Sequence, residues 1–245
     1  LDLTFINGLY IPYTSSQKYI TQSVHWLLPN AELEMKELNK RLGLQLSNYS
    51  VINNSIDINY YDQIIDKNPK IIRNEKRIAC VGRIDNRKNQ LNFLKALINT
   101  DYEILFIGNH GPNSKKYYKK LLKLSKSRGN VRFLGHLGQD DIFKILLSCK
   151  AHILPSWVET PGLVSLEAAY AGCNLVLTDK GSVREYFGDN GFYCKPNDID
   201  SIYNAVESAM LYTNNLHFRN YIKSKFSWSV TAKQTLSAYN KVLNL

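Results

Sequence analysis

Two glutamates, with seven residues between them, lie in a segment that combines the end of a strand with the start of a helix. Pro155 closes an apolar run, Glu159 follows in the loop, and Glu167 lies in a helical pattern that opens at Pro161-Gly162. The first-turn amides of a helix have no partner within the helix and attract phosphate. We therefore expect an anion site flanked by two carboxylates. The alternative is two ordinary surface acids near a helix start, which the helix dipole favours.

Two cations follow an apolar run earlier in the sequence. Gly82 allows a tight turn, and Arg83 and Lys88 bracket the loop after it. Cations beside a helix N-terminus can clamp a diphosphate without a metal, although loop cations are often simply solvated. The sequence contains neither the phosphate loop G-x4-G-K-[ST] nor the dinucleotide motif G-x-G-x-x-G. This disfavours the P-loop and NAD-binding classes.

The composition is that of a globular protein with an anionic partner. The 245 residues carry 31 Lys and Arg against 21 Asp and Glu, a formal charge of +10, and 44% of the residues are hydrophobic. Such a charge favours a nucleotide, a nucleic acid or an acidic membrane surface. The apolar runs are far shorter than the ~20 residues that a membrane-spanning helix needs. We expect one large domain, or one domain with part of another.

The cysteines indicate a cytoplasmic protein. They form no C-x-x-C pair and no Cys/His group at metal-ligand spacing, and no signal-peptide pattern opens the sequence. We expect no metal site, and we expect reduced core thiols at Cys80, Cys149, Cys173 and Cys194.

The elements that must position these side chains alternate along the chain. Short apolar runs rich in β-branched and aromatic residues, typical of buried parallel strands, alternate with helical patterns. This predicts an α/β fold, a Rossmann-like parallel sheet with helices on both faces, whose ligands bind at the carboxyl ends of the strands. The expected strands are 78–81, 103–107, 131–134, 151–154, 175–177 and 192–194.

The two ends of the chain read differently from the sheet region. Residues 1–56 hold an expected strand at 24–28, a helix at 31–42 that stops at Gly43, and a strand at 49–52, which is too little sheet to stand alone. Residues 57–76 are polar and are the expected linker, followed by the sheet domain at 77–229. Residues 230–245 form an amphipathic helix whose apolar face needs a partner.

Together these segments resemble the donor-binding half of the family-4 glycosyltransferases, the retaining enzymes of the GT-B type. The resemblance covers roughly residues 24–245, and it departs from the family at Ser55, Thr160-Pro161, Ser182 and Arg184. The matching motifs are Gly82-Arg83 with Lys88 for G-R-x4-K, Glu159 and Glu167 for E-x7-E, Asn54-Ser55-Ile56-Asp57 for N-G-x-D, Phe133-Leu134-Gly135 for F-L-G, and Gly181-Ser182-Val183-Arg184-Glu185 for G-G-x-P-E.

The resemblance implies a role for each site residue. Arg83 and Lys88 hold the diphosphate of a nucleotide diphosphate sugar and stabilise its charge as it leaves, and Glu159 orients the sugar; these are the expected catalytic residues. Glu167 accepts hydrogen bonds from the ribose. No metal or cofactor is expected. The other donor-binding residues are Gly82, Gly135, His136, Gly162, Leu163 and Val164, which meet the diphosphate or the base mainly through their backbone.

The resemblance also implies a retaining transfer to a glycan or lipid-linked acceptor, in bacterial polysaccharide biosynthesis. The family holds the acceptor in an N-terminal domain, of which residues 1–56 match only the last part, and residues 230–245 match the segment that returns to it. We therefore expect a shortened chain that is weakly active or inactive alone.

Three other functions stay open at this stage. A nucleotide-sugar 2-epimerase shares the fold, although the E-x7-E spacing favours transfer. A non-catalytic nucleotide-sugar-binding module would need the same contacts without turnover. A nucleic-acid binder would explain the charge, but no RNP-like motif, helix-turn-helix signature or zinc spacing supports it.

One helical pattern is unusually basic. Its lysines could dock on anionic lipid at the inner face of a membrane, or they could be a solvated outer face whose apolar side covers the sheet. These lysines are Lys115, Lys116, Lys119, Lys120, Lys123 and Lys126.

Overall fold

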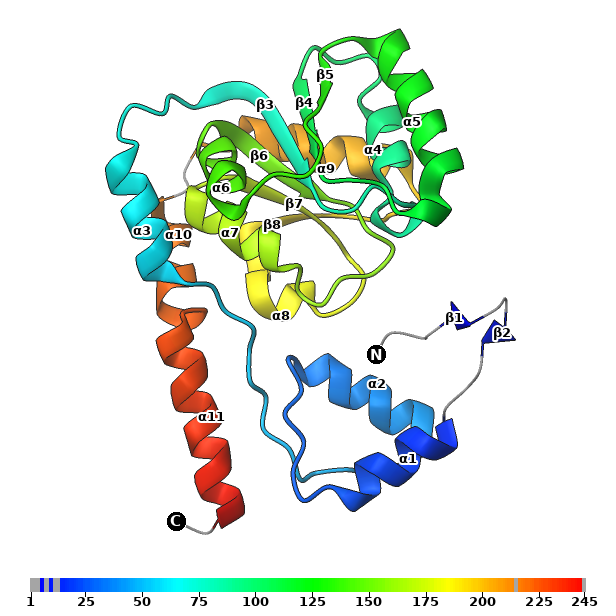
Figure 1. Ribbon diagram of the computed structural model, residues 1–245, viewed down its shortest axis with the longest axis vertical. Helices are drawn as coiled ribbons and strands as arrows, with labels where there is room; N and C mark the ends of the chain where they lie inside the picture. The colour runs from blue at the N-terminus through cyan, green and yellow to red at the C-terminus, as the bar shows by residue number, and fades with distance from the viewer. Residues whose placement is uncertain (1–4, 7–8, 11–13, 214–215, 244–245) are drawn as a thin grey trace. The chain divides into compact units, whose positions relative to one another are not determined.

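The computed structural model describes residues 5–6, 9–10, 14–213 and 216–243. It divides the chain into two compact units (Figure 1), and each is described by itself. Unit 1 comprises Leu1–Asn54 and Ser229–Leu245, and unit 2 comprises Ser55–Trp228. Among the described residues, no helix is both long and apolar enough to cross a membrane.

Unit 2 is built on a six-stranded sheet in the order β5-β4-β3-β6-β7-β8. All its strand pairs are parallel, so the predicted Rossmann-like fold is confirmed. The chain moves outward from β3 to β5 and then returns to the other side of β3, so the strand order switches direction between β3 and β6. Ligands of such sheets bind at this switch point. The strands are β3 (Asn74–Val81), β4 (Glu103–Ile107), β5 (Val131–Phe133), β6 (Cys149–Leu154), β7 (Asn174–Thr178) and β8 (Gly191–Cys194).

Helices cover both faces of the sheet, as right-handed crossovers between parallel strands require (Figure 1). One face carries α4 (Gln90–Ala96), α5 (Lys115–Arg128) and α9 (Ile199–Leu211). The other carries α6 (Gln139–Leu147) and α7 (Leu163–Ala171), with α3 (Ile58–Lys67) and α10 (Leu216–Lys225) packed outside them. Shorter helical segments are η1 (Asn86–Lys88), η2 (Pro112–Ser114), α8 (Val183–Phe187) and η3 (Gly188–Asn190).

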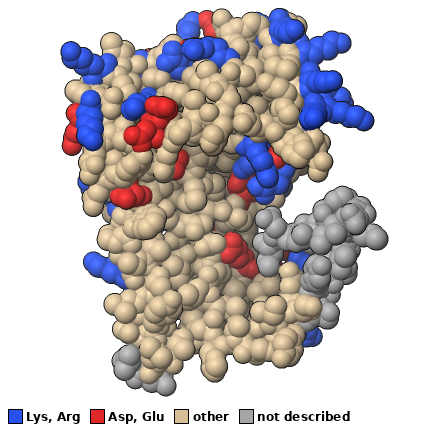
Figure 2. Space-filling view, viewed as in Figure 1, with Lys and Arg blue, Asp and Glu red and all other residues tan. Residues whose placement is uncertain are grey.

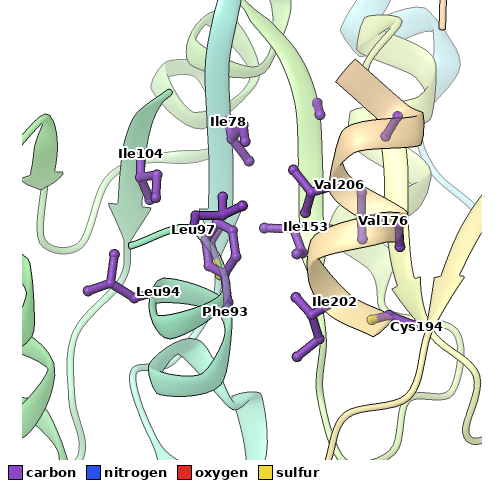
Figure 3. Packing of buried hydrophobic residues seen from close by; sticks show 14 of the residues in the cluster. Ile78, Phe93, Leu94, Leu97, Ile104, Ile153, Val176, Cys194, Ile202 and Val206 are labelled. Atoms are coloured by element: carbon purple, nitrogen blue, oxygen red, sulfur yellow. The ribbon is translucent and has the colours of Figure 1, made fainter. Parts of the chain in front are cut away.

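The main core lies between the sheet and the first of these helix layers. Figure 3 shows Ile153 of β6 beside Ile202 and Val206 of α9, and all three side chains are fully buried. Burying one such side chain contributes roughly 1.5–3 kcal/mol. The four cysteines are also buried and unpaired, as expected. The core therefore fixes the strands whose carboxyl ends carry the site.

The expected linker at 57–76 holds α3 and the start of β3, so the structure corrects that interpretation. Asp57 caps α3 by accepting a hydrogen bond from the Tyr60 amide at 3.1 Å. Tyr61 and Ile64 are only 1% and 5% exposed. The Asn- and Asp-rich composition hid the apolar face of this helix, which belongs to unit 2.

Unit 1 is mostly helical. Its elements are β1 (Phe5–Ile6), β2 (Leu9–Tyr10), α1 (Thr14–Ser23), α2 (Glu32–Leu42) and α11 (Trp228–Leu243), of which α11 begins one residue before the unit boundary. The expected helix at 31–42 is present, and Gly43 ends it in the left-handed conformation with φ 62°. The expected strands at 24–28 and 49–52 are reduced to one parallel bridge between Leu27 and Tyr49. The C-terminal helix packs in this unit, where Thr231 donates to the Asn53 carbonyl at 2.9 Å.

Candidate functional site

The loops at the carboxyl ends of neighbouring strands are joined to one another by backbone hydrogen bonds. The loop after β4 bonds the loops after β3 and β5, and the loop after β6 bonds the loops after β3 and β7. The sequence-predicted segments therefore share one edge of the sheet. Among these bonds are Ile84 to Asn109 at 3.0 Å, Gly108 to Gly135 at 2.6 Å, Trp157 to Arg87 at 2.9 Å and Ser182 to Glu159 at 3.1 Å.

Two glycines allow this close packing of loops. A Cβ at Gly108 would overlap the carbonyl oxygen of Gly82, and one at Gly181 would overlap that of Glu159. Both glycines also have positive φ, at 130° and 88°. A side chain at either position would therefore push apart the loops that carry the site.

Lys88 and Glu159 form an ion pair across this edge. Their side chains are 14% and 7% exposed, so both charges are largely removed from water. Lys88 is held by η1, where the Asp85 carboxylate accepts from its backbone amide at 3.0 Å. The structure therefore brings together two of the predicted catalytic residues, one from each motif. Removing either partner would leave an uncompensated buried charge, which strongly destabilises a folded protein.

Arg83, the third predicted catalytic residue, stands apart from this pair. Its side chain is 65% exposed and is ion-paired with Asp85 at 3.1 Å. The Asp85 carboxylate thus contacts both the side chain of Arg83 and the backbone amide of Lys88. These two contacts order the loop between the two cations. Gly82 begins this loop with φ 146°.

The amino end of α7 is open. Its N-cap residue is Gly162, with φ 79° and no side chain to cap the first-turn amides, and Leu163 and Val164 are the first residues of the helix. At the carboxyl end, Arg73 donates to the carbonyls of Ala171 and Gly172, and Arg219 also reaches Ala171 at 3.3 Å. These cations cover the negative end of the helix dipole, and the uncapped positive end attracts anions.

Beneath the loop of Glu159, His152 is fully buried in β6. Its Nε2 lies 3.4 Å from the Ser165 hydroxyl in the first turn of α7. Burial, followed by the charge of Lys88, lowers the pKa of His152 to about 3, so its ring is neutral. The buried cation of the site is therefore Lys88, and His152 supports α7 from below.

Glu167 lies one turn into α7 and faces two other helices. Its Oε1 accepts a hydrogen bond from the Tyr61 hydroxyl at 2.7 Å, and the Gln139 amide donates to that hydroxyl at 2.6 Å. Burial raises the pKa of Glu167. The two predicted glutamates therefore have different partners. Tyr61 and Gln139 were missed in the sequence because neither lies in a recognisable motif.

The predicted base-binding residues lie in the loop after β5. Gly135 has φ 67°, and its carbonyl accepts from the Gly108 amide, which holds the loops after β4 and β5 together. His136 is exposed. The backbone of this loop thus reaches the same edge as the Lys88–Glu159 pair, and the loop leads into α6.

Asn89 is a further residue that sequence reasoning missed. It is 4% exposed and has a left-handed backbone with φ 60°. Its side-chain amide donates to the carbonyls of Pro155 at 3.0 Å and Pro196 at 2.7 Å. It therefore ties the residue after Lys88 to the strand end before Glu159. The available signal was its position directly after Lys88.

Within the described part of the chain, no group of three or more His, Cys, Asp or Glu side chains is placed to hold a metal ion. The polar groups at the site are the Lys88–Glu159 pair, Arg83, the open helix end and Glu167. Such a set can bind a diphosphate by charge and by backbone amides.

Comparison with known proteins identifies the family of this chain. The model described as glycosyl transferases group 1 matches residues 62–225. An uncharacterized glycosyltransferase of Methanocaldococcus jannaschii is 28% identical over 184 residues, which cover 70% of this chain and 46% of the relative. The O-antigen chain mannosyltransferase B of Escherichia coli is 26% identical over 169 residues, covering 65% and 44%. The chain thus spans less than half the length of these curated relatives.

Solved structures agree on the fold. Anabaena HepE in complex with UDP matches with a TM-score of 0.79 at 18% identity, over 95% of this chain and 68% of that one. Sucrose-phosphate synthase from Thermosynechococcus elongatus matches with a TM-score of 0.79 at 17% identity, over 94% and 61%. At these identities the likeness concerns the fold alone.

Proposed function

The chain belongs to the group 1 glycosyl transferases, and from this premise we propose that it is the donor-binding part of an enzyme that transfers a sugar from a nucleotide diphosphate sugar. The observation that carries this proposal is the buried ion pair of Lys88 and Glu159 at the switch point of the sheet. It sets a cation for a leaving diphosphate beside a carboxylate for the hydroxyls of a sugar. The solved UDP complex of HepE, which shares the fold, supports a nucleotide as ligand.

In the proposed complex, the diphosphate lies on the amides of Leu163 and Val164 at the open end of α7. Lysine carries three donors, so Lys88 can keep Glu159 and still donate to a phosphate oxygen. Arg83 completes the clamp from the solvent side, where its side chain is exposed. The ribose meets Glu167 and the base meets the backbone of Gly135 and His136.

Charge on the leaving diphosphate is then stabilised by fixed cations and the helix dipole, which is electrostatic preorganisation. We propose that transfer needs no metal and retains the anomeric configuration, with the acceptor attacking from the face that the diphosphate leaves. The acceptor in this proposal is a glycan or a lipid-linked glycan, which agrees with the O-antigen mannosyltransferase among the relatives.

A calorimetric titration tests the donor assignment. UDP, GDP, ADP and a random oligonucleotide are titrated into the protein with and without a chelator. We expect one nucleoside diphosphate to bind, with no change on chelation. Preferential binding of the oligonucleotide would contradict the proposal, and a strict need for a divalent metal would contradict its metal-independent form.

The 2-epimerase is the alternative enzyme, and the non-catalytic module is the third possibility. Incubation of the nucleotide sugar with candidate acceptors, followed by NMR of the products, separates all three. Transfer with the anomeric configuration of the donor supports the proposal. A C2-epimerised sugar identifies an epimerase, and an unchanged bound donor identifies a binding module.

We also propose that the protein works in the cytoplasm against an anionic membrane, which it contacts through α5. The helix carries six lysines and one arginine and no acid, and the six lysines are all exposed. At about 100° per residue they occupy one arc about 140° wide. None of the six forms an ion pair within the described parts of the chain, and Figure 2 shows basic side chains gathered over α5.

The aromatic residues of α5 favour lipid over single-stranded nucleic acid as the partner. The Tyr117 hydroxyl accepts from the Leu91 amide, and the Tyr118 ring packs against His110 with 4.6 Å between ring centroids. Neither ring is therefore free to stack on bases, which such nucleic-acid binders need. Lysines near an anionic lipid surface contribute about 1 kcal/mol each.

Vesicle sedimentation tests this contact with neutral and anionic vesicles. Replacing Lys119, Lys120, Lys123 and Lys126 by Gln should weaken binding to anionic vesicles more than about tenfold. The control replaces four exposed lysines elsewhere, which removes the same charge from other surfaces, and it should bind nearly as the parent does. Equal losses would show that only net charge matters. The control lysines are Lys67, Lys70, Lys95 and Lys195.

A further inference from the structure

The carboxylate of Glu167 is held on one oxygen only. Its Oε1 accepts from the Tyr61 hydroxyl at 2.7 Å and lies 3.4 Å from the Gln139 amide nitrogen. Because the Tyr61 hydroxyl donates its proton to Glu167, its oxygen can accept from Gln139, which it does at 2.6 Å. No described residue bonds Oε2. One oxygen is therefore fixed and the other is available to a ligand.

The hydroxyl that holds Glu167 is itself fixed by packing. Tyr61 is 1% exposed, and its ring lies 4.2 Å from that of Phe143 between centroids. The ring cannot rotate away without opening the layer between α3 and α6. Gln139 is the first residue of α6 and directly follows the loop of Gly135 and His136. Three helices thus meet at one carboxylate.

We propose that Tyr61 and Gln139 are positioning residues, which hold Glu167 so that its free oxygen meets the ribose hydroxyls of the donor nucleotide. This inference rests on the proposed function, which assigns Glu167 to the ribose. It deepens that function by naming the residues that select a ribonucleotide. The loop proposed to meet the base leads directly into Gln139. The contacts to the base and to the ribose are therefore fixed relative to each other.

The electrostatics of the group agree with this role. Burial raises the pKa of Glu167, and hydrogen bonds from Tyr61 and Gln139 act against that increase. These two are the groups that face the carboxylate, one from α3 and one from α6. Burial, together with the charge of Glu167, also raises the pKa of Tyr61, so its hydroxyl keeps the proton that it donates. Removing that hydroxyl should let Glu167 protonate at higher pH.

The test compares Tyr61→Phe with Tyr60→Phe. Both changes remove one hydroxyl from α3, and both hydroxyls bond a residue of α6, since Tyr60 donates to Asp140. Only Tyr61 touches Glu167. The probes are whichever of UDP, GDP and ADP binds the parent protein most tightly, and its 2′,3′-dideoxy analogue. Affinities are measured by calorimetry from neutral to acid pH.

We expect Tyr61→Phe to weaken binding of the ribonucleotide about fivefold to tenfold and of the dideoxy analogue less than about twofold. The acid loss of ribonucleotide affinity should also move to higher pH. Tyr60→Phe should leave both affinities within about twofold of the parent.

The experiment distinguishes a failure of the proposed function from a failure of the positioning role. If the parent binds both probes equally, the ribose assignment of Glu167 in the proposed function is wrong. If the parent prefers the ribonucleotide and Tyr61→Phe keeps that preference and the same pH profile, the proposed function stands and the positioning role is wrong. Equal effects of Tyr61→Phe and Tyr60→Phe would also overturn the positioning role, because they would show that each hydroxyl only links helix α3 to helix α6.

Discussion

The two glutamates of the E-x7-E segment lie in opposite electrostatic settings. Glu159 is buried against the full positive charge of Lys88. Glu167 meets only the neutral hydroxyl of Tyr61 and the amide of Gln139, and burial raises its pKa. On the proposed assignment, the sugar end of the site is therefore organised by charge and the nucleoside end by hydrogen bonds. The same residue type in one motif serves two purposes because its partners differ.

The largest expected effect is on the charged end. Lys88→Met leaves the buried carboxylate of Glu159 without its partner, which should lower the free energy of unfolding by about 3–5 kcal/mol. Lys88→Met combined with Glu159→Gln removes both charges and should recover much of that loss. The measurement is urea denaturation of the two variants and the parent.

Lys180→Met is the matched control for that loss. Lys180 also forms an ion pair, with the carboxylate of the adjacent residue Asp179 at 3.6 Å, but the Lys180 side chain is 58% exposed. An exposed pair contributes under about 1 kcal/mol. If Lys88→Met costs no more than Lys180→Met, the Lys88–Glu159 pair is not the organising contact, and the contrast between the two glutamates disappears.

The next effect concerns ligand affinity at the same end. Arg83→Ala should weaken binding of the nucleoside diphosphate by about 1.5–3 kcal/mol, which is roughly one to two decades. Binding of the free nucleoside should hardly change, because it carries no diphosphate. Arg87→Ala removes an equal charge from the same exposed loop and serves as the control. Similar losses in both variants would indicate general attraction and no specific clamp.

Replacing Asn89 should have a smaller effect, on the stability of the fold, because Asn89 joins the two charged loops by neutral hydrogen bonds. Asn89→Ala should lower the free energy of unfolding by about 2 kcal/mol, since the Pro155 carbonyl loses its donor and the Pro196 carbonyl keeps only the Asn92 amide at 3.2 Å. Asn89→Gly loses the same bonds but accepts the left-handed backbone, so it should be less damaging by about 1 kcal/mol. Thermal and urea denaturation of the pair measure both terms. Equal stability of the two variants would mean that backbone strain at φ 60° contributes nothing.

The sheet and its carboxyl-end loops were predictable from the sequence because they depend on local patterns. Apolar β-branched runs ending in Gly, Pro or an acid located β3, β4, β6 and β7 and the loops of Lys88 and Glu159. These signals are periodic or lie within a few residues, so a single sequence contains them.

The support of the site was not predictable for a physical reason. Tyr61 and Gln139 act on Glu167 across 106 and 28 residues of sequence, through hydrogen bonds that form only when three helices pack together. Nothing in their residue types or spacing marks them. The polar composition of 57–76 also favoured a linker, although Ile58, Tyr61 and Ile64 recur at a spacing that buries one side of a helix.

A change of each glutamate to glutamine tests the comparison most directly, and Glu167→Gln has the smallest expected effect. Glu159→Gln removes the partner of a buried lysine and should destabilise the protein at neutral pH by about 3 kcal/mol. Glu167→Gln should have the opposite sign. The pKa of Glu167 is raised by burial, so folding favours its protonated form, and the parent loses stability as pH rises through that pKa. Glutamine keeps an oxygen for the Tyr61 hydroxyl and carries no charge, so the variant should be more stable at neutral pH by under about 1 kcal/mol, the scale of one neutral hydrogen bond. The gain should vanish at acid pH, where Glu167 is protonated in the parent as well. Urea denaturation across this pH range decides the matter: two destabilised variants would mean that both carboxylates are held as ions.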